Sequence, residues 1–137
     1  ILDKNEKMIN KIDVVIINFF GHLDSFFYYA KSVFIGKSML KKFEKEGGQS
    51  PVEAAKLGCK IYHGAFVYNF EEIYEILKEN KISKEINDTD ELARNISDDF
   101  NNYKKEDQSF INLMNILGQK TLNDNMREIN KFLFNEN

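Results

Sequence analysis

Short apolar runs that stop at or near a glycine alternate with stretches of helical periodicity, and this alternation limits the fold more than any other feature of the sequence. The apolar runs are residues 13–19, 32–35 and 60–63, with a weaker one at 83–86. Such runs, rich in β-branched and aromatic side chains, predict buried strands. Because strands that alternate with helices pair in parallel, we expect an α/β fold in which a parallel sheet is flanked by helices.

The clearest helix start is Ser50-Pro51-Val52-Glu53. Ser50 can cap the helix, Pro51 suits its first position, and Glu53 can close a capping box. We expect this helix to stop at Gly58. Four more helices are expected, the first at residues 23–30. The second is capped by Asn69 and has Ile73, Ile76 and Leu77 on its apolar face. The third is opened by residues 87–90 and carries Leu92, Ala93, Ile96 and Phe100, and the fourth is a long C-terminal helix from about Asp107, in which Gly118 can introduce a kink.

The composition indicates one folded domain, residues 1–137, because 42% of the 137 residues are hydrophobic and 30% are charged. The single cysteine, Cys59, excludes an intramolecular disulfide and a zinc finger, and we expect no metal site. The net charge of −3 argues against nucleic acid as a partner. No uncharged run approaches the roughly 20 residues of a transmembrane helix. The chain begins with Ile1 rather than Met, so we expect it to be processed or part of something longer.

Three loops are candidates for binding a ligand, because ligands of open parallel sheets bind beyond the carboxyl ends of the strands. These loops lie around Gly21, between residues 36 and 50, and between residues 64 and 69. In the second loop, Gly47 and Gly48 precede the capped helix, so their backbone N–H groups can receive a phosphate or simply form a flexible turn. Neither the Rossmann glycine fingerprint nor the P-loop is present.

Several side chains near these loops allow two interpretations. The carboxylate of Glu53 can close the capping box or accept hydrogen bonds from a ribose diol. His22 can meet a ligand at a strand end or be an ordinary loop residue. The four aromatic residues 26–29 exceed what one helix face can bury, so some of them can contact a neighbouring domain. No combination of nucleophile and base indicates a catalytic centre.

Four segments resemble one protein family. They are Phe34-Ile35-Gly36-Lys37-Ser38-Met39-Leu40, Gly47-Gly48-Gln49-Ser50-Pro51-Val52-Glu53-Ala54-Ala55, Leu57-Gly58-Cys59-Lys60-Ile61-Tyr62-His63-Gly64 and Asn69-Phe70-Glu71-Glu72-Ile73. In this order and spacing they are similar to the C-terminal half of 3-deoxy-D-manno-octulosonic acid (Kdo) transferases, over roughly residues 13–100. Several short motifs in order are more specific than any one of them.

The resemblance implies the C-terminal half of a GT-B fold, in which two Rossmann-like domains face a cleft. It implies a glycosyltransferase of lipopolysaccharide biosynthesis that moves Kdo from CMP-Kdo to a lipid A precursor at the cytoplasmic face of the inner membrane, without a metal or cofactor. In the family the C-terminal domain binds the CMP-sugar, whereas the catalytic carboxylate belongs to an N-terminal acceptor-binding domain. The chain is therefore expected to be a Rossmann-like donor-binding domain that holds no catalytic residue and is inactive alone.

The same resemblance implies a set of donor-binding residues. They are Gly47 and Gly48 in the phosphate-side loop, Gln49 and Ser50 as hydrogen-bonding groups in place of the family's His-Asn, Glu53 as the ribose partner, Asn69 at a helix N-terminus, and Ser38 and Gly21 along the cleft. His22 stands where the family has an acidic residue. These departures leave two alternatives open: a divergent, non-catalytic Rossmann-like interaction module, and a GT-B transferase that uses another nucleotide sugar, such as a UDP donor.

Overall fold

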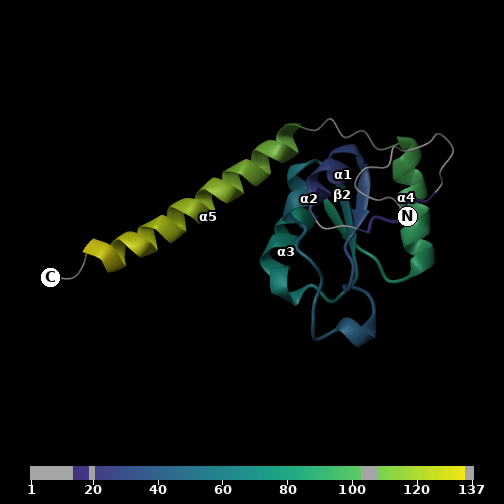
Figure 1. The fold of residues 1–137 in the computed structure, drawn as a ribbon, viewed down its shortest axis with the longest axis horizontal. Helices are drawn as coiled ribbons and strands as arrows, with labels where there is room; N and C mark the ends of the chain where they lie inside the picture. The colour runs from purple at the N-terminus through teal and green to yellow at the C-terminus, as the bar shows by residue number, and fades with distance from the viewer. Residues whose placement is uncertain (1–13, 19–20, 103–107, 135–137) are drawn as a thin grey trace.

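A three-stranded parallel sheet, in the order β1-β2-β3, forms the centre of the molecule (Figure 1). The computed structural model describes residues 14–18, 21–102 and 108–134. The strands are β1 (Ser32–Phe34), β2 (Lys60–His63) and β3 (Ser83–Glu85). Val33 pairs with Ile61, and Ile61 pairs with Ser83, so these three side chains share one face of the sheet.

Helices lie on both faces of this sheet (Figure 1). In chain order they are α1 (Leu23–Tyr29), the 3-10 turn η1 (Lys41–Phe43), α2 (Val52–Lys56), the 3-10 turn η2 (Tyr68–Phe70), α3 (Glu71–Glu79), α4 (Thr89–Asn102) and α5 (Gln108–Phe134). α2 and α3 cover one face and α4 covers the other, while α5 starts beside α2 and then extends away from the rest of the molecule. The predicted parallel sheet with flanking helices and a long C-terminal helix is confirmed.

The apolar core lies between the sheet and the helices α2 and α3. Ile61 of β2, Ala55 of α2 and Leu77 of α3 are completely buried. Cys59 belongs to the same cluster, and its Sγ donates a weak hydrogen bond to the carbonyl oxygen of Phe27 at 3.2 Å. Met114, near the start of α5, is also buried here, so the beginning of the long helix shares in the core.

The first predicted strand, residues 13–19, is wrong in the part that the structure describes. Between Val14 and Asn18 only Ile17 makes a β-bridge, and Val14 and Ile16 are 76% and 59% exposed. Asp13 and Phe19 lie outside the described residues. A run of β-branched residues is compatible with a strand. A strand in a sheet also needs a neighbouring strand to pair with and other side chains to pack on it, and the run itself does not specify either.

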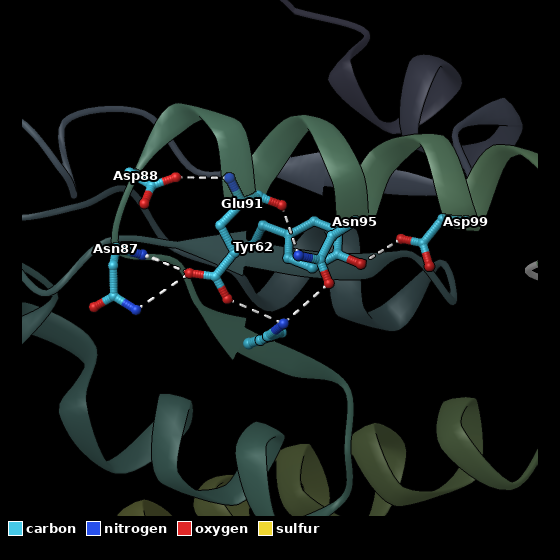
Figure 2. Close-up of polar contacts among 7 residues, drawn as sticks. Tyr62, Asn87, Asp88, Glu91, Asn95 and Asp99 are labelled. Carbon is cyan, nitrogen blue, oxygen red and sulfur yellow. Dashed lines mark hydrogen bonds and ion pairs between the residues drawn. The ribbon is translucent and has the colours of Figure 1, made fainter.

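The helix α4 packs on the sheet through its polar side. Ile96 and Phe100 are 39% and 73% exposed, whereas Glu91, Asn95 and Asp99 make the contacts with the sheet (Figure 2). The Tyr62 hydroxyl donates to Asp99 Oδ2 at 2.6 Å and is buried with it. The sheet presents polar groups on this face, and because unpaired buried polar groups are costly, the polar side of the helix packs against it.

A lysine on this face of the sheet completes the polar contact. Lys84 Nζ lies 3.0 Å from Asn95 Oδ1 and 3.1 Å from Glu91 Oε1. Asp88 caps the helix, because its Oδ1 accepts the Glu91 backbone N–H at 2.7 Å (Figure 2). Hydrogen bonds from the Asn87 backbone, and then from Lys84 and the Asn87 side chain, lower the pKa of Glu91.

The start of α3 corrects the prediction for Asn69. Asn69 lies within η2, α3 begins two residues later at Glu71, and no side chain caps it. The Asn69 amide instead donates to the carbonyl oxygen of Glu46 at 2.9 Å. A loop 23 residues earlier in the chain therefore supplies the acceptor that this amide uses, and no local pattern indicates such a partner. In α5, by contrast, the helix continues through Gly118 without interruption.

Candidate functional site

A groove of about 640 Å³ opens where α1, the end of β1 and the start of α2 meet. It is lined by Leu23, Phe27, Val33, Phe34, Ile35, Gly36, Gln49, Ser50, Val52, Glu53 and Lys56. This position, at the carboxyl end of a parallel strand, is where open α/β sheets bind ligands. The volume and the mixture of apolar walls with a few polar groups suit a small organic molecule.

The polar side of the groove comes from α2 and from Gln49 and Ser50 in the segment before it. Gln49, Ser50 and Glu53 are exposed residues of this wall, and Lys56 follows one turn further along. Because residues three apart in a helix lie on the same face, Glu53 and Lys56 present a negative and a positive charge to one groove. The opposite wall, with Leu23 and Phe27 of α1, is apolar.

The start of α2 leaves Glu53 available to a ligand. Ser50 Oγ accepts the Val52 backbone N–H at 3.3 Å, but α2 begins at Val52 with Pro51 in the N-cap position and no side-chain cap, so Ser50 precedes the cap position that it was predicted to fill. Within the described part of the chain, Glu53 does not return the second hydrogen bond of a capping box. α2 has only five residues, so its dipole adds little, and the exposed carboxylate is the principal charge at this end of the groove.

Gly47 and Gly48 lie in a tightly packed loop outside the groove. Gly47 N donates to Phe43 O at 3.1 Å and Gly48 N to Phe66 O at 2.7 Å. A Cβ on Gly47 would lie 2.7 Å from Asn69 Nδ2, and the φ of Gly47 is +69°. Both amides are thus already bonded inside the protein, and their binding to a phosphate remains a prediction that would require these bonds to open.

Ser38 joins two loops that the sequence separates by 26 residues. Its hydroxyl donates to Ile35 O at 2.6 Å and accepts the backbone N–H of Gly64 at 2.9 Å, and the residue is completely buried. Gly21 is exposed, with a φ of +85°, just before α1. The structure therefore brings Gln49, Ser50 and Glu53 to the groove, whereas the remaining predicted residues lie outside its lining: Ser38, Gly47, Gly48, Asn69 and Gly21.

The sequence did not predict three of the groove residues discussed above: Lys56 of α2, and Leu23 and Phe27 of α1. Lys56 could have been found, because positions 53 and 56 lie three residues apart on one face of the helix. Leu23 and Phe27 carry no such signal, because their place in the groove depends on how α1 packs beside α2. No group of three or more His, Cys, Asp or Glu residues that could hold a metal occurs in the described segments.

His63 ends β2 and is buried against α3. Its ring lies 4.3 Å from the Tyr74 ring, and its Nδ1 is 2.8 Å from Gly64 O. Burial lowers the pKa of His63, although the bond to the Gly64 carbonyl opposes this effect, and burial raises the pKa of Tyr74. His63 therefore has the environment of a neutral, structural histidine.

We expect the stability of the protein to fall when the pH drops below about 6.5, the ordinary pKa of histidine. In the unfolded chain His63 takes up a proton there, whereas the folded protein resists this until a lower pH, so unfolding gains protons and becomes easier. Urea midpoints at pH 7.5 and 5.5 measure the effect. H63N should show a smaller difference between the two pH values than the parent chain, and an equal difference would contradict the assignment.

Comparisons with known proteins give no relative: no family model, curated protein or solved structure matches the chain. Among the helices of the described residues, none combines the length and apolar character needed to cross a membrane.

Proposed function

We propose that this chain is the donor-binding domain of a glycosyltransferase with a GT-B fold, related to Kdo transferases, and that the groove beside α2 holds a CMP-sugar. The observation that carries the proposal is the position of Glu53. Its exposed carboxylate lines a groove at the carboxyl end of β1, and the motif resemblance implies that the same residue is the ribose partner. A carboxylate with two oxygens can accept hydrogen bonds from both hydroxyls of a ribose diol.

The other lining residues suit the remaining parts of a nucleotide. Phe27, Ile35 and Val52 offer apolar surface on which a pyrimidine ring can pack. Gln49 and Ser50 carry hydrogen-bonding groups at the mouth of the groove, where the sugar hydroxyls and phosphate of the donor would lie. Lys56 adds a positive charge to the same wall, which favours an anionic ligand.

In the proposed enzyme this domain supplies binding and orientation, and an N-terminal acceptor-binding domain supplies the catalytic carboxylate. The full protein would transfer Kdo from CMP-Kdo to a lipid A precursor, with no metal or cofactor, at the cytoplasmic face of the inner membrane. The domain alone would bind the donor without turning it over.

Glu53 provides the test of this proposal. We expect CMP to shift the amide NMR signals of residues 49–56, and E53Q to weaken CMP binding at least about fivefold, because the neutral amide forms a weaker hydrogen bond to the ribose hydroxyls. E72Q is the matched control, since Glu72 is an exposed glutamate on α3 outside the groove. Absence of CMP shifts at millimolar concentration, or equal losses in both variants, would refute the donor assignment.

The choice of nucleotide is tested by thermal shift. Binding raises the melting temperature by mass action, so CMP and UMP at equal concentration rank the two bases directly. A larger shift with UMP would replace the proposal with a transferase that uses a UDP-sugar.

The exposed aromatic residues of α1 favour a second candidate, a non-catalytic interaction module. Tyr28 and Tyr29 are 64% and 82% exposed and pack edge to face at 5.1 Å between ring centroids. Aromatic side chains are enriched in protein interfaces. A transfer assay with the parent protein decides between the candidates: turnover of CMP-Kdo supports the transferase, and a parent that binds a protein through α1 without turnover supports the module.

A further inference from the structure

Two opposite charges of α2 line the groove beside one another. Glu53 and Lys56 are both exposed, and both belong to the lining of the groove. They lie three residues apart on one helix face, yet within the described residues neither side chain forms an ion pair or a hydrogen bond with the other or with any further group. Both charged groups are therefore available to a ligand in the groove.

The order of the polar groups along α2 gives a direction to a bound nucleotide. Gln49 and Ser50 lie at one end of the wall, Glu53 lies in the middle, and Lys56 is the last residue of the helix. With the phosphate at Gln49 and Ser50 and the ribose at Glu53, the base is the part of the nucleotide that continues toward Lys56. Glu53 and Lys56 are about 4.5 Å apart along the helix axis, a separation that suits two directly bonded groups such as a ribose and its base.

The apolar wall places an aromatic residue at the same end of the groove. Phe27, in the last turn of α1, is part of the lining. Cys59 ties the end of α1 to the end of α2, because its Sγ lies 3.2 Å from Phe27 O and 3.4 Å from Ala30 O while its backbone N–H donates to Ala54 O at 3.0 Å. A pyrimidine ring at this end can therefore pack on Phe27 while its polar edge meets Lys56.

A lysine recognises the edge of a base through donors alone. Its ammonium group carries three N–H donors and no acceptor. Cytosine presents two neighbouring acceptors on its Watson–Crick edge, O2 and N3, whereas uracil has an N3–H donor beside O2. The ammonium can bond to both acceptors of cytosine, but at N3 of uracil it meets a hydrogen instead of a lone pair. A site that offers donors therefore favours cytosine, because uracil leaves one of them unpaired.

We infer that Lys56 is the residue that selects the base of the nucleotide. Its ammonium donates to O2 and N3 of cytosine while the ring packs on Phe27, so the groove prefers a cytidine to a uridine nucleotide. This inference rests on the proposed function of the groove and adds the group that distinguishes the two bases. In the opposite orientation of the nucleotide Lys56 would contact the phosphate, and it would then not distinguish cytosine from uracil.

Titrations of the whole 137-residue chain with CMP, cytidine and UMP, followed through the amide NMR signals of residues 49–56, test the assignment. K56M keeps an apolar side chain and removes the ammonium group. We expect its Kd for CMP to increase at least about fivefold, and its Kd for cytidine by the same factor, because a charge-assisted hydrogen bond to the base is lost. The Kd for UMP should change less than about twofold, since uracil N3 offers no acceptor.

K78M is the matched control, since Lys78 is an exposed lysine of α3 outside the groove. It removes the same charge from the chain, and we expect all three ligands to bind it as they bind the parent chain. Circular dichroism checks that both variants stay folded. An equal loss in K56M and K78M would trace the effect to net charge and overturn the inference.

The remaining outcomes separate this inference from the proposed function. Equal losses of CMP and UMP in K56M, with cytidine unchanged, would assign Lys56 to the phosphate and overturn only its role at the base. Unchanged CMP binding in K56M, together with a loss in E53Q, would do the same. A parent chain that does not bind CMP, or that prefers UMP, would refute the donor assignment and the role of Lys56 together.

Discussion

Replacement of Gly64 by alanine should destabilise this protein by more than about 3 kcal/mol, or prevent it from folding, because there is no room for a methyl group. A Cβ on Gly64 would lie 2.4 Å from both Met39 Cα and Ser38 O, and 2.7 Å from Met39 Cβ. Two of these atoms belong to the backbone, so a rotation of side chains cannot relieve the clash. The loops after β1 and β2 would have to separate, which would also break the bond from Gly64 N to Ser38 Oγ.

The matched control for this substitution is G118A. Gly118 lies inside α5, and a Cβ there meets no atom within 4 Å. Alanine should therefore stabilise this helix by up to about 1 kcal/mol, since glycine is the weaker helix former. Urea denaturation of both variants measures the contrast. A loss below about 1 kcal/mol in G64A would show that the two loops are not held as closely as the structure indicates.

Removal of the Tyr62 hydroxyl is the second substitution with a large expected effect. Y62F should cost about 2 kcal/mol, because Asp99 would lose a hydrogen bond of 2.6 Å at a site where both residues are buried. Without this donor the buried carboxylate has neither water nor the hydroxyl to bond to, so the free-energy cost of removing it from water is no longer offset. Y29F is the control, since Tyr29 is 82% exposed, and we expect a change within about 0.5 kcal/mol there.

A double-mutant cycle identifies the partner. The combination of Y62F with D99A should cost less than the sum of the two single changes, because each single change already breaks the same bond. Urea titration gives the free energies of unfolding of the unmutated chain, of the two single variants and of the double variant. Additive losses would mean that Tyr62 and Asp99 stabilise the protein independently, and the polar attachment of α4 to the sheet would then have another basis.

The sequence was sufficient for the elements whose patterns are local. β2 was expected at residues 60–63 and is found there, and a helix was expected after Ser50-Pro51 and is found at Val52–Lys56. In both cases the signal is a short run of side chains with a glycine or a proline beside it, so it can be read from adjacent residues. The same reasoning placed Gln49, Ser50 and Glu53 together at the start of α2.

The failed predictions all depend on distant partners. The helix α4 was expected where it is found, but the sequence did not indicate that its polar residues would meet Lys84 and Tyr62 of the sheet while Ile96 and Phe100 stay exposed. Asn69 was expected to cap a helix, but it bonds to a carbonyl in another loop. An amphipathic pattern shows that a helix has two different sides, and the surface it packs against decides which side is buried.

The sequence by itself therefore determined the alternation of strands and helices, the start of α2 after Pro51 and the apolar spacing along α5, because each follows from side chains a few residues apart. Only the tertiary structure decided that Gly47, Gly48 and Ser38 tie loops together, that α1 supplies the second wall of the groove, and that apolar side chains along the outer part of α5 remain exposed. These outcomes depend on which surfaces meet across the fold, and the free energy of such contacts belongs to pairs of segments rather than to either segment alone.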